Sequence, residues 1–132
     1  MWITPKTNWL KNDYFNAEDF NRIKNNLIYL RELAIKLYKE FEIQQVSEDK
    51  TYKDYFYADE INLLENNLEK INQNTLNIIY GKKTIYMDNG NTMTYIELNR
   101  IESAIFDLYD KLSNQINGRR NLKFNLGKRG GL

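Results

Sequence analysis

Paired carboxylates are the side chains in this sequence whose types and spacing best suit chemistry. Glu18 adjoins Asp19, and Asp59 adjoins Glu60. Two neighbouring carboxylates can divide the general-acid and general-base roles of a reaction between them. Each pair also stands where a helix is expected to begin, and acidic residues stabilise the positive end of the helix dipole there. The helix-start interpretation accounts for both pairs, and we prefer it to a catalytic one.

The residue types that most often activate these groups are missing. The 132 residues include no cysteine and no histidine. Thiolate nucleophiles, disulfides and His-dependent triads are therefore excluded, as are zinc sites built on these ligands. The segment GKRGGL near the C-terminus lacks the spacing of a phosphate-binding loop. We expect a protein that is not an enzyme, needs no cofactor or metal, and takes no small-molecule substrate.

Charge is balanced overall but uneven along the chain. Lysine and arginine total 19, and aspartate and glutamate total 18. General nucleic-acid binders need an excess of positive charge, so this balance argues against nucleic acid as the partner. No apolar run approaches the roughly 18–20 residues of a membrane span, so we expect no membrane partner. After Asp110 no acid follows, whereas six basic residues do: Lys111, Arg119, Arg120, Lys123, Lys128 and Arg129.

One short phrase occurs three times. It reads NAEDFNRIKNNL at residues 16–27, YADEINLLENNL at 57–68 and TYIELNRIESAI at 94–105, so the copies begin 41 and then 37 residues apart. Apolar residues at spacings of three and four follow each start, which predicts one amphipathic helix per copy. We expect helices near 17–44, 57–79 and 94–117. Three apolar stripes can bury one another, so the fold class is all-α, a three-helix bundle over residues 15–117.

Capping signals mark two of the three helix starts. Asn16 with Asp19 and Thr94 with Glu97 have the spacing of a capping box. The middle copy has Tyr57 at the cap position, so its start should be weaker, or capped by Asp54 after a shifted first turn. In the aligned copies the column Leu27, Leu68 and Ile105 should meet in the core.

An asparagine column accompanies the apolar stripes, at Asn21, Asn62 and Asn99. Such a residue can pair across helices, or bond to the backbone of a neighbouring loop, and so fix the register. A solvated boundary position is the alternative. Because the residue type recurs in all three copies, we favour the register role. The pairs Asn25–Asn26 and Asn66–Asn67 are interpreted as polar positions on the outer face.

Two segments flank the bundle and are the candidate partner-binding parts. Residues 1–14 form an N-terminal arm that Pro5 biases toward an extended conformation. Residues 118–132 form a C-terminal docking tail whose alternating apolar residues are typical of a strand that adds to a partner's sheet edge. Folding back on the bundle is the alternative for the tail. The predicted contacts are Trp2, Ile3, Trp9, Arg119, Arg120, Leu122, Phe124, Leu126, Lys128 and Arg129.

The linker between the second and third helices has two interpretations. Asn-Gly lies between the β-prone runs TIYM and TMTY, which is the signal for a short β-hairpin. An irregular linker is equally compatible with the sequence. Gly81 is predicted to stop the second helix.

Several of these motifs carry a family resemblance. WITPKTNW followed by YFNAEDFNRIKNNL, and later NGNTMTYIELNRIESAIFDLYDKL, resembles a small helical domain of tail, baseplate and fibre-region proteins. These proteins belong to bacteriophages and prophages of low-GC Gram-positive bacteria. The TPKTxW opening and the two NRI triplets, at Asn21–Ile23 and Asn99–Ile101, are the specific parts. The middle copy departs from them with Asn62-Leu63-Leu64.

The resemblance implies a non-enzymatic virion structural or adaptor protein of the tail or baseplate region. Such a protein would be made in the cytoplasm of the host bacterium, dock onto other tail or baseplate subunits, and be used in several copies. The alternative is a host-interaction or regulatory bundle that binds another protein or DNA through its basic C-terminal tail. Basic residues on the helices are interleaved with acids, which favours the adaptor.

Overall fold

The fold is an all-α three-helix bundle, as the periodicity predicts. The computed structural model describes residues 2–54, 58–81 and 93–128, with the side chains described as far as residue 119. The helices are α1 (Ala17–Leu37), α2 (Ala58–Gln73) and α3 (Tyr95–Lys128). The hairpin alternative and the cap position Tyr57 lie outside the described residues.

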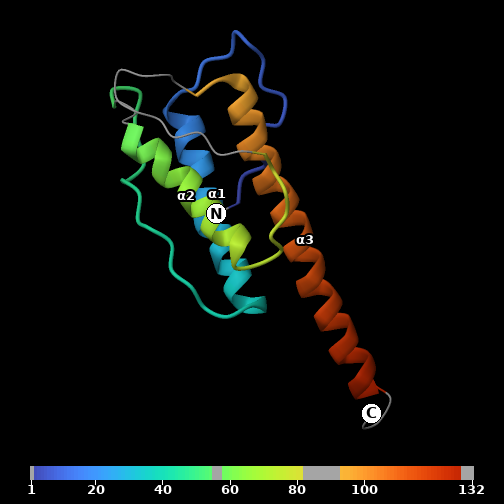
Figure 1. Ribbon diagram of the computed structural model, residues 1–132. Helices are drawn as coiled ribbons and strands as arrows, with labels where there is room; N and C mark the ends of the chain where they lie inside the picture. The colour runs from blue at the N-terminus through green and yellow to red at the C-terminus, as the bar shows by residue number, and fades with distance from the viewer. Residues whose placement is uncertain (1, 55–57, 82–92, 129–132) are drawn as a thin grey trace.

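All three helices run in the same direction. Figure 1 shows α1, α2 and α3 beginning at one end of the molecule and descending toward the other. Each helix must therefore be reached by a segment that returns the chain along the bundle. We name two of these segments strap 1 (residues 2–14), which precedes α1, and strap 2 (residues 38–54), which joins α1 toward α2.

The predicted helix starts and core are confirmed. Asn16 Oδ1 accepts from the Asp19 N–H at 3.3 Å, and the Asp19 carboxylate accepts from the Asn16 N–H at 3.1 Å, which completes the capping box. Thr94 Oγ1 accepts from the Glu97 N–H at 3.4 Å, and α3 begins at the next residue. The column Leu27, Leu68 and Ile105 is buried, with at most 1% of any side chain exposed.

Two helices end earlier than their apolar spacing predicts. Helix α1 stops at Leu37 rather than 44, because Tyr38 turns extended and the acids Glu40 and Glu42 would lie at the negative end of the helix dipole. Phe41 nevertheless remains buried, since strap 2 carries it back against the core.

Helix α2 ends at Gln73 rather than 79. Asn77 adopts a left-handed backbone with φ 51°, and its N–H donates to the Asn72 carbonyl at 2.8 Å, which turns the chain away. Gly81 therefore does not stop α2. Its φ of +97° instead lets the backbone pass so close to Arg100 that a Cβ would lie 2.7 Å from Cδ of that side chain.

Helix α3 is longer than predicted. The extended conformation expected for residues 118–132 is wrong for 118–128, which continue α3 to Lys128. Propagating an existing helix adds one hydrogen bond for each residue fixed, whereas a strand would need a partner edge. Gly118 costs such a helix only about 1 kcal/mol. The alternating apolar pattern therefore did not decide the conformation.

Candidate functional site

Strap 1 packs on its own bundle. Trp9 is 2% exposed, and its indole Nε1–H donates to Glu102 at 2.5 Å. Trp2 stacks on Tyr109, with ring centroids 3.9 Å apart and planes within 7°. Trp9 is therefore a core residue and not an anchor for another protein. Of the predicted contacts in the arm, Trp2 is half-buried, and Ile3 keeps 45% of its surface exposed.

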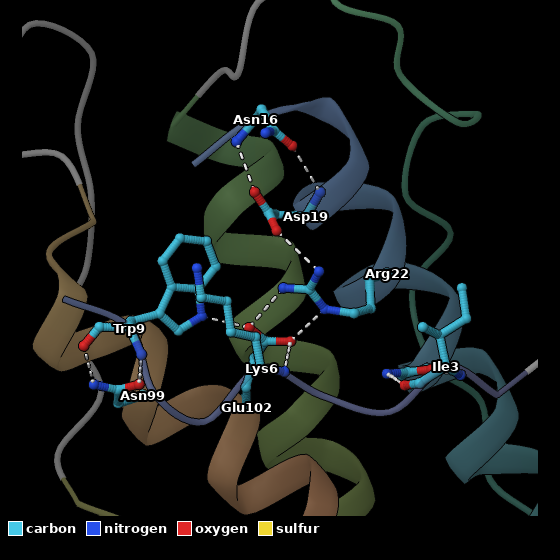
Figure 2. Close-up of polar contacts among 9 residues, drawn as sticks. Ile3, Lys6, Trp9, Asn16, Asp19, Arg22, Asn99 and Glu102 are labelled. Atoms are coloured by element: carbon cyan, nitrogen blue, oxygen red, sulfur yellow. Dashed lines mark hydrogen bonds and ion pairs between the residues drawn. The ribbon is translucent and has the colours of Figure 1, made fainter. Parts of the chain in front are cut away.

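Asparagine side chains hold the straps in place. Asn99 accepts from the Trp9 N–H at 2.7 Å and donates to the Trp9 carbonyl at 3.0 Å (Figure 2). Asn21 makes the same two bonds with Lys50, at 2.7 and 2.8 Å. An amide offers one donor edge and one acceptor edge, so it satisfies an extended backbone as a neighbouring strand would. The loop-backbone form of the register role is confirmed at both positions.

Three more asparagines form clamps of this kind, and two of them correct a prediction. Asn26 and Asn67 are buried, not outer-face positions, because each binds the N–H and carbonyl of a strap residue. The additional pairs are Asn26 with Ile3, Asn67 with Gln44 and Asn72 with Ile78.

The clamps show that the repeated unit is a strap followed by a helix. Asn26 and Asn67 each hold a residue 23 positions earlier in the chain. Trp9 lies 12 residues before Asn21, and Lys50 lies 12 residues before Asn62. Both are clamped by the first asparagine of a phrase on another repeat's helix. Strap 1 is thus the counterpart of strap 2, and the N-terminal arm belongs to the fold.

Buried ion pairs link the repeats in a fixed order. The Arg22 guanidinium donates to both Glu102 oxygens, at 2.7 and 2.8 Å, and to Asp19 at 2.9 Å (Figure 2). Arg100, at the same place in the third phrase, donates to Glu65 at 2.5 Å and to Glu97 at 2.6 Å. The first repeat therefore pairs with the third, and the third with the second.

Burial would lower the pKa of the two arginines, but their bonds to carboxylates outweigh it. The pKa of Arg22 is raised by Glu102 and Asp19, and that of Arg100 by Glu97 and Glu65. Both guanidinium groups therefore stay charged and committed to the bundle interior. Their role in this geometry is to join helices.

The departure of the middle phrase from NRI has a physical reason. The same order of pairing would bring position 63 of the second repeat to position 24 of the first, where Lys24 replaces the glutamate. Lys24 Nζ donates to the Ser47 carbonyl at 3.1 Å and to Asp49 at 2.5 Å. An arginine at position 63 would place a second cation beside it, and Leu63 avoids this repulsion.

The substitution of lysine for glutamate also suits the strap. Lys6 and Ser47 each lie 15 residues before the first asparagine of their phrase. In the first repeat Glu102 accepts from the Lys6 N–H at 3.2 Å, whereas in the second Lys24 donates to the Ser47 carbonyl. The two straps are held at the same position by side chains of opposite charge.

The surface offers no converging set of reactive groups. A shallow hollow of about 800 Å³ lies between α1 and strap 2. Its polar side chains are already engaged, since Asn21 holds Lys50, Arg22 binds Glu102 and Asp49 binds Lys24. No three carboxylates among the described residues lie close enough together to hold a metal ion. None of the described helices combines the length and apolarity that a membrane span requires.

The predicted tail contacts lie at or beyond the end of the bundle. Arg119 donates to the Leu37 carbonyl at 3.2 Å, so it covers the C-terminal end of α1. The 34 residues of α3 span about 51 Å at 1.5 Å per residue, and Figure 1 shows α3 continuing past the ends of α1 and α2. We name residues 120–128 the α3 extension. It contains Arg120, Leu122, Phe124, Leu126 and Lys128, while Arg129 lies outside the described residues.

Comparison of the chain with protein-family models, with curated proteins and with solved structures finds no match.

Proposed function

We propose that this protein is a non-enzymatic structural or adaptor subunit of the tail or baseplate region of a bacteriophage particle. It acts by docking onto other subunits of that assembly. The α3 extension is the observation that carries the proposal, because it is a basic helix end that projects beyond the bundle. The resemblance of TPKTNW and of the NRI phrases to phage tail-region domains supplies the setting.

The interior of the bundle supports a scaffolding role. The carboxylates that resembled acid–base pairs serve the fold, since Asp19 completes a capping box and binds Arg22. Glu102, which is fully buried, joins three segments through Arg22, Trp9 and Lys6. A bundle braced in this way presents a rigid base from which one helix extends.

Docking is assigned to the α3 extension and not to strap 1. Trp9 is buried, and the strap is clamped at Ile3 and again at Trp9. Releasing it would leave both side-chain amides and the Glu102 carboxylate without these partners, which is costly for buried groups. A helix end beyond the core loses nothing when it binds. An isolated helix of this length is only marginally stable in water, so packing on a partner would also stabilise it.

The test is incorporation into particles. A phage that encodes this chain would be given a copy truncated after Arg119, and purified particles would be analysed by mass spectrometry. We expect the truncated chain to keep its helical circular dichroism and to be absent from particles. The matched control is the full chain with Lys11→Glu and Lys70→Glu, two exposed lysines on the bundle, which should incorporate normally. Normal incorporation of the truncated chain would contradict the proposal.

The helical state of the C-terminal segment also favours a second candidate function. A helix end with basic residues and no acid has the charge required to contact DNA phosphates. Fluorescence anisotropy with a duplex of about 30 base pairs at 150 mM salt separates the two functions. Binding that requires residues 120–132 and weakens steeply with salt would support a regulatory DNA-binding bundle. Absence of binding would support the adaptor.

A further inference from the structure

Charge divides this molecule into two complementary parts. Residues 1–119 hold 15 of the 19 basic side chains and all 18 acids, whereas residues 120–132 hold the other four basic side chains and no acid. The acids of the bundle are concentrated in strap 2. Between residues 40 and 54 the chain has five acids and only two lysines. The basic part of the chain is therefore matched by an acidic surface on the same chain.

The acids of strap 2 face solvent even where they have partners. The side chains of Glu42 and Asp49 remain 81% and 63% exposed while they pair with Arg31 and Lys24. Glu48 is exposed as well. These carboxylates stay accessible to cations from another molecule. Strap 2 is also rigidly placed, since Asn67 clamps it at Gln44 and Asn21 clamps it at Lys50.

We propose that the α3 extension of one copy docks on strap 2 of a second copy of this chain. The extension cannot reach its own strap 2, because α3 is one continuous helix that leads away from the bundle (Figure 1). Two extensions do not pair with each other, since both are positive. Opposite charge on the extension and on strap 2 draws copies together in a head-to-tail arrangement.

This contact deepens the proposed function and rests on it, since it supplies the way in which several copies assemble. A head-to-tail contact uses a different surface on each partner, so every bound copy keeps one free extension or one free strap 2. Such contacts close into a ring or continue as a filament. Surface charge pairs are screened over about 10 Å at 0.1 M salt, so the association should be strongest at low ionic strength.

The experiment measures the mass of the purified full chain by light scattering at about 100 μM, in 20 mM and 300 mM salt. We expect a mass above the 15.9 kDa of one chain that rises with concentration at low salt and falls to the monomer value at high salt. Arg120→Glu with Lys123→Glu reverses the extension, and Glu42→Lys with Glu48→Lys reverses strap 2. Each variant alone should be monomeric, and an equimolar mixture should associate, because opposite charges then face each other again.

The Lys11→Glu, Lys70→Glu control changes the net charge as much as the extension variant does, and it should associate like the wild type. Circular dichroism establishes that each variant is folded. A monomeric wild type at low salt would overturn the inference. So would association that survives charge reversal, or one that depends on the extension but not on strap 2. Because this readout needs no particle, it can fail while the incorporation test succeeds, and the reverse.

Discussion

Replacing Glu102 with glutamine tests the ion-pair network at the residue on which it centres. The side chain is fully buried, and its two oxygens accept four hydrogen bonds. Oε1 accepts from Arg22 Nε at 2.7 Å and from the Lys6 N–H at 3.2 Å. Oε2 accepts from Arg22 Nη2 at 2.8 Å and from Trp9 Nε1 at 2.5 Å. Glutamine keeps the shape of this side chain but has one oxygen and one NH₂.

The loss of stability follows from these four bonds. Whichever oxygen becomes NH₂, two buried donors lose their acceptor, and one of them belongs to the Arg22 cation. Each unsatisfied buried donor costs roughly 1–3 kcal/mol, and removing one partner of a buried ion pair typically costs about 3–5 kcal/mol. Asp19 remains beside Arg22 and compensates part of the charge. We expect the free energy of unfolding to fall by about 3–5 kcal/mol.

The assay is guanidinium unfolding at pH 7 followed by far-UV circular dichroism. Asp110→Asn is the matched control, because it makes the same chemical change at an exposed position on the same helix. Its effect should stay within about 0.5 kcal/mol. Trp9→Phe removes only one of the four donors and should cost less than Glu102→Gln. A loss below about 1 kcal/mol for Glu102→Gln would refute the claim that Glu102 holds strap 1 to the bundle.

Three further predictions concern the core, a helix start and acid stability. Truncation to alanine in the buried column should cost about 2–5 kcal/mol at each position, measured by the same unfolding assay, and three unchanged melting temperatures would contradict the bundle core; the positions are Leu27, Leu68 and Ile105. Thr94→Ala should cost roughly 0.5–2 kcal/mol through loss of the α3 cap, whereas an unchanged unfolding midpoint would mean that the 3.4 Å bond contributes nothing. Hydrogen bonds from Lys24 and then Asn25 lower the pKa of Asp49 below 3.8, so their stabilising effect is complete above pH 3.8 and is lost as the pH falls through the lower pKa of the folded state. Asp49→Asn should therefore be less stable than the wild type at pH 7, and the difference should shrink toward zero below pH 3.8; a difference independent of pH would contradict this assignment.

The helix starts and the core column were predictable because their causes are local. A capping box needs residues three apart, and an apolar stripe repeats every three or four residues. Asn16, Thr94 and Leu27 carry these signals openly in the sequence. The helix ends were less predictable. They depend on the acids after Leu37 and on the left-handed Asn77, which apolar spacing does not register.

The straps escaped prediction because nothing periodic marks them. Their conformation is imposed by asparagines on helices far away in the sequence, such as Asn99, which lies 90 residues from Trp9. One signal was available. Trp9 and Lys50 stand at the same distance before the phrase, which indicates that the repeated unit begins before the helix. For the same reason Trp9 looked like a free anchor, although an indole needs a buried acceptor that only the folded chain supplies.

The central claim is that strap 1 belongs to the fold while the α3 extension does not, and two truncations compared by guanidinium unfolding test it most directly. Removing residues 2–9 deletes the Trp9 anchor, and loss of a buried tryptophan side chain alone costs about 3–5 kcal/mol. Removing residues 120–132 takes away helix beyond the last described contact with α1, at Arg119. The account predicts a loss of at least about 3 kcal/mol for the first truncation and less than about 1 kcal/mol for the second. An unchanged free energy of unfolding without residues 2–9, or a bundle that unfolds without residues 120–132, would contradict it.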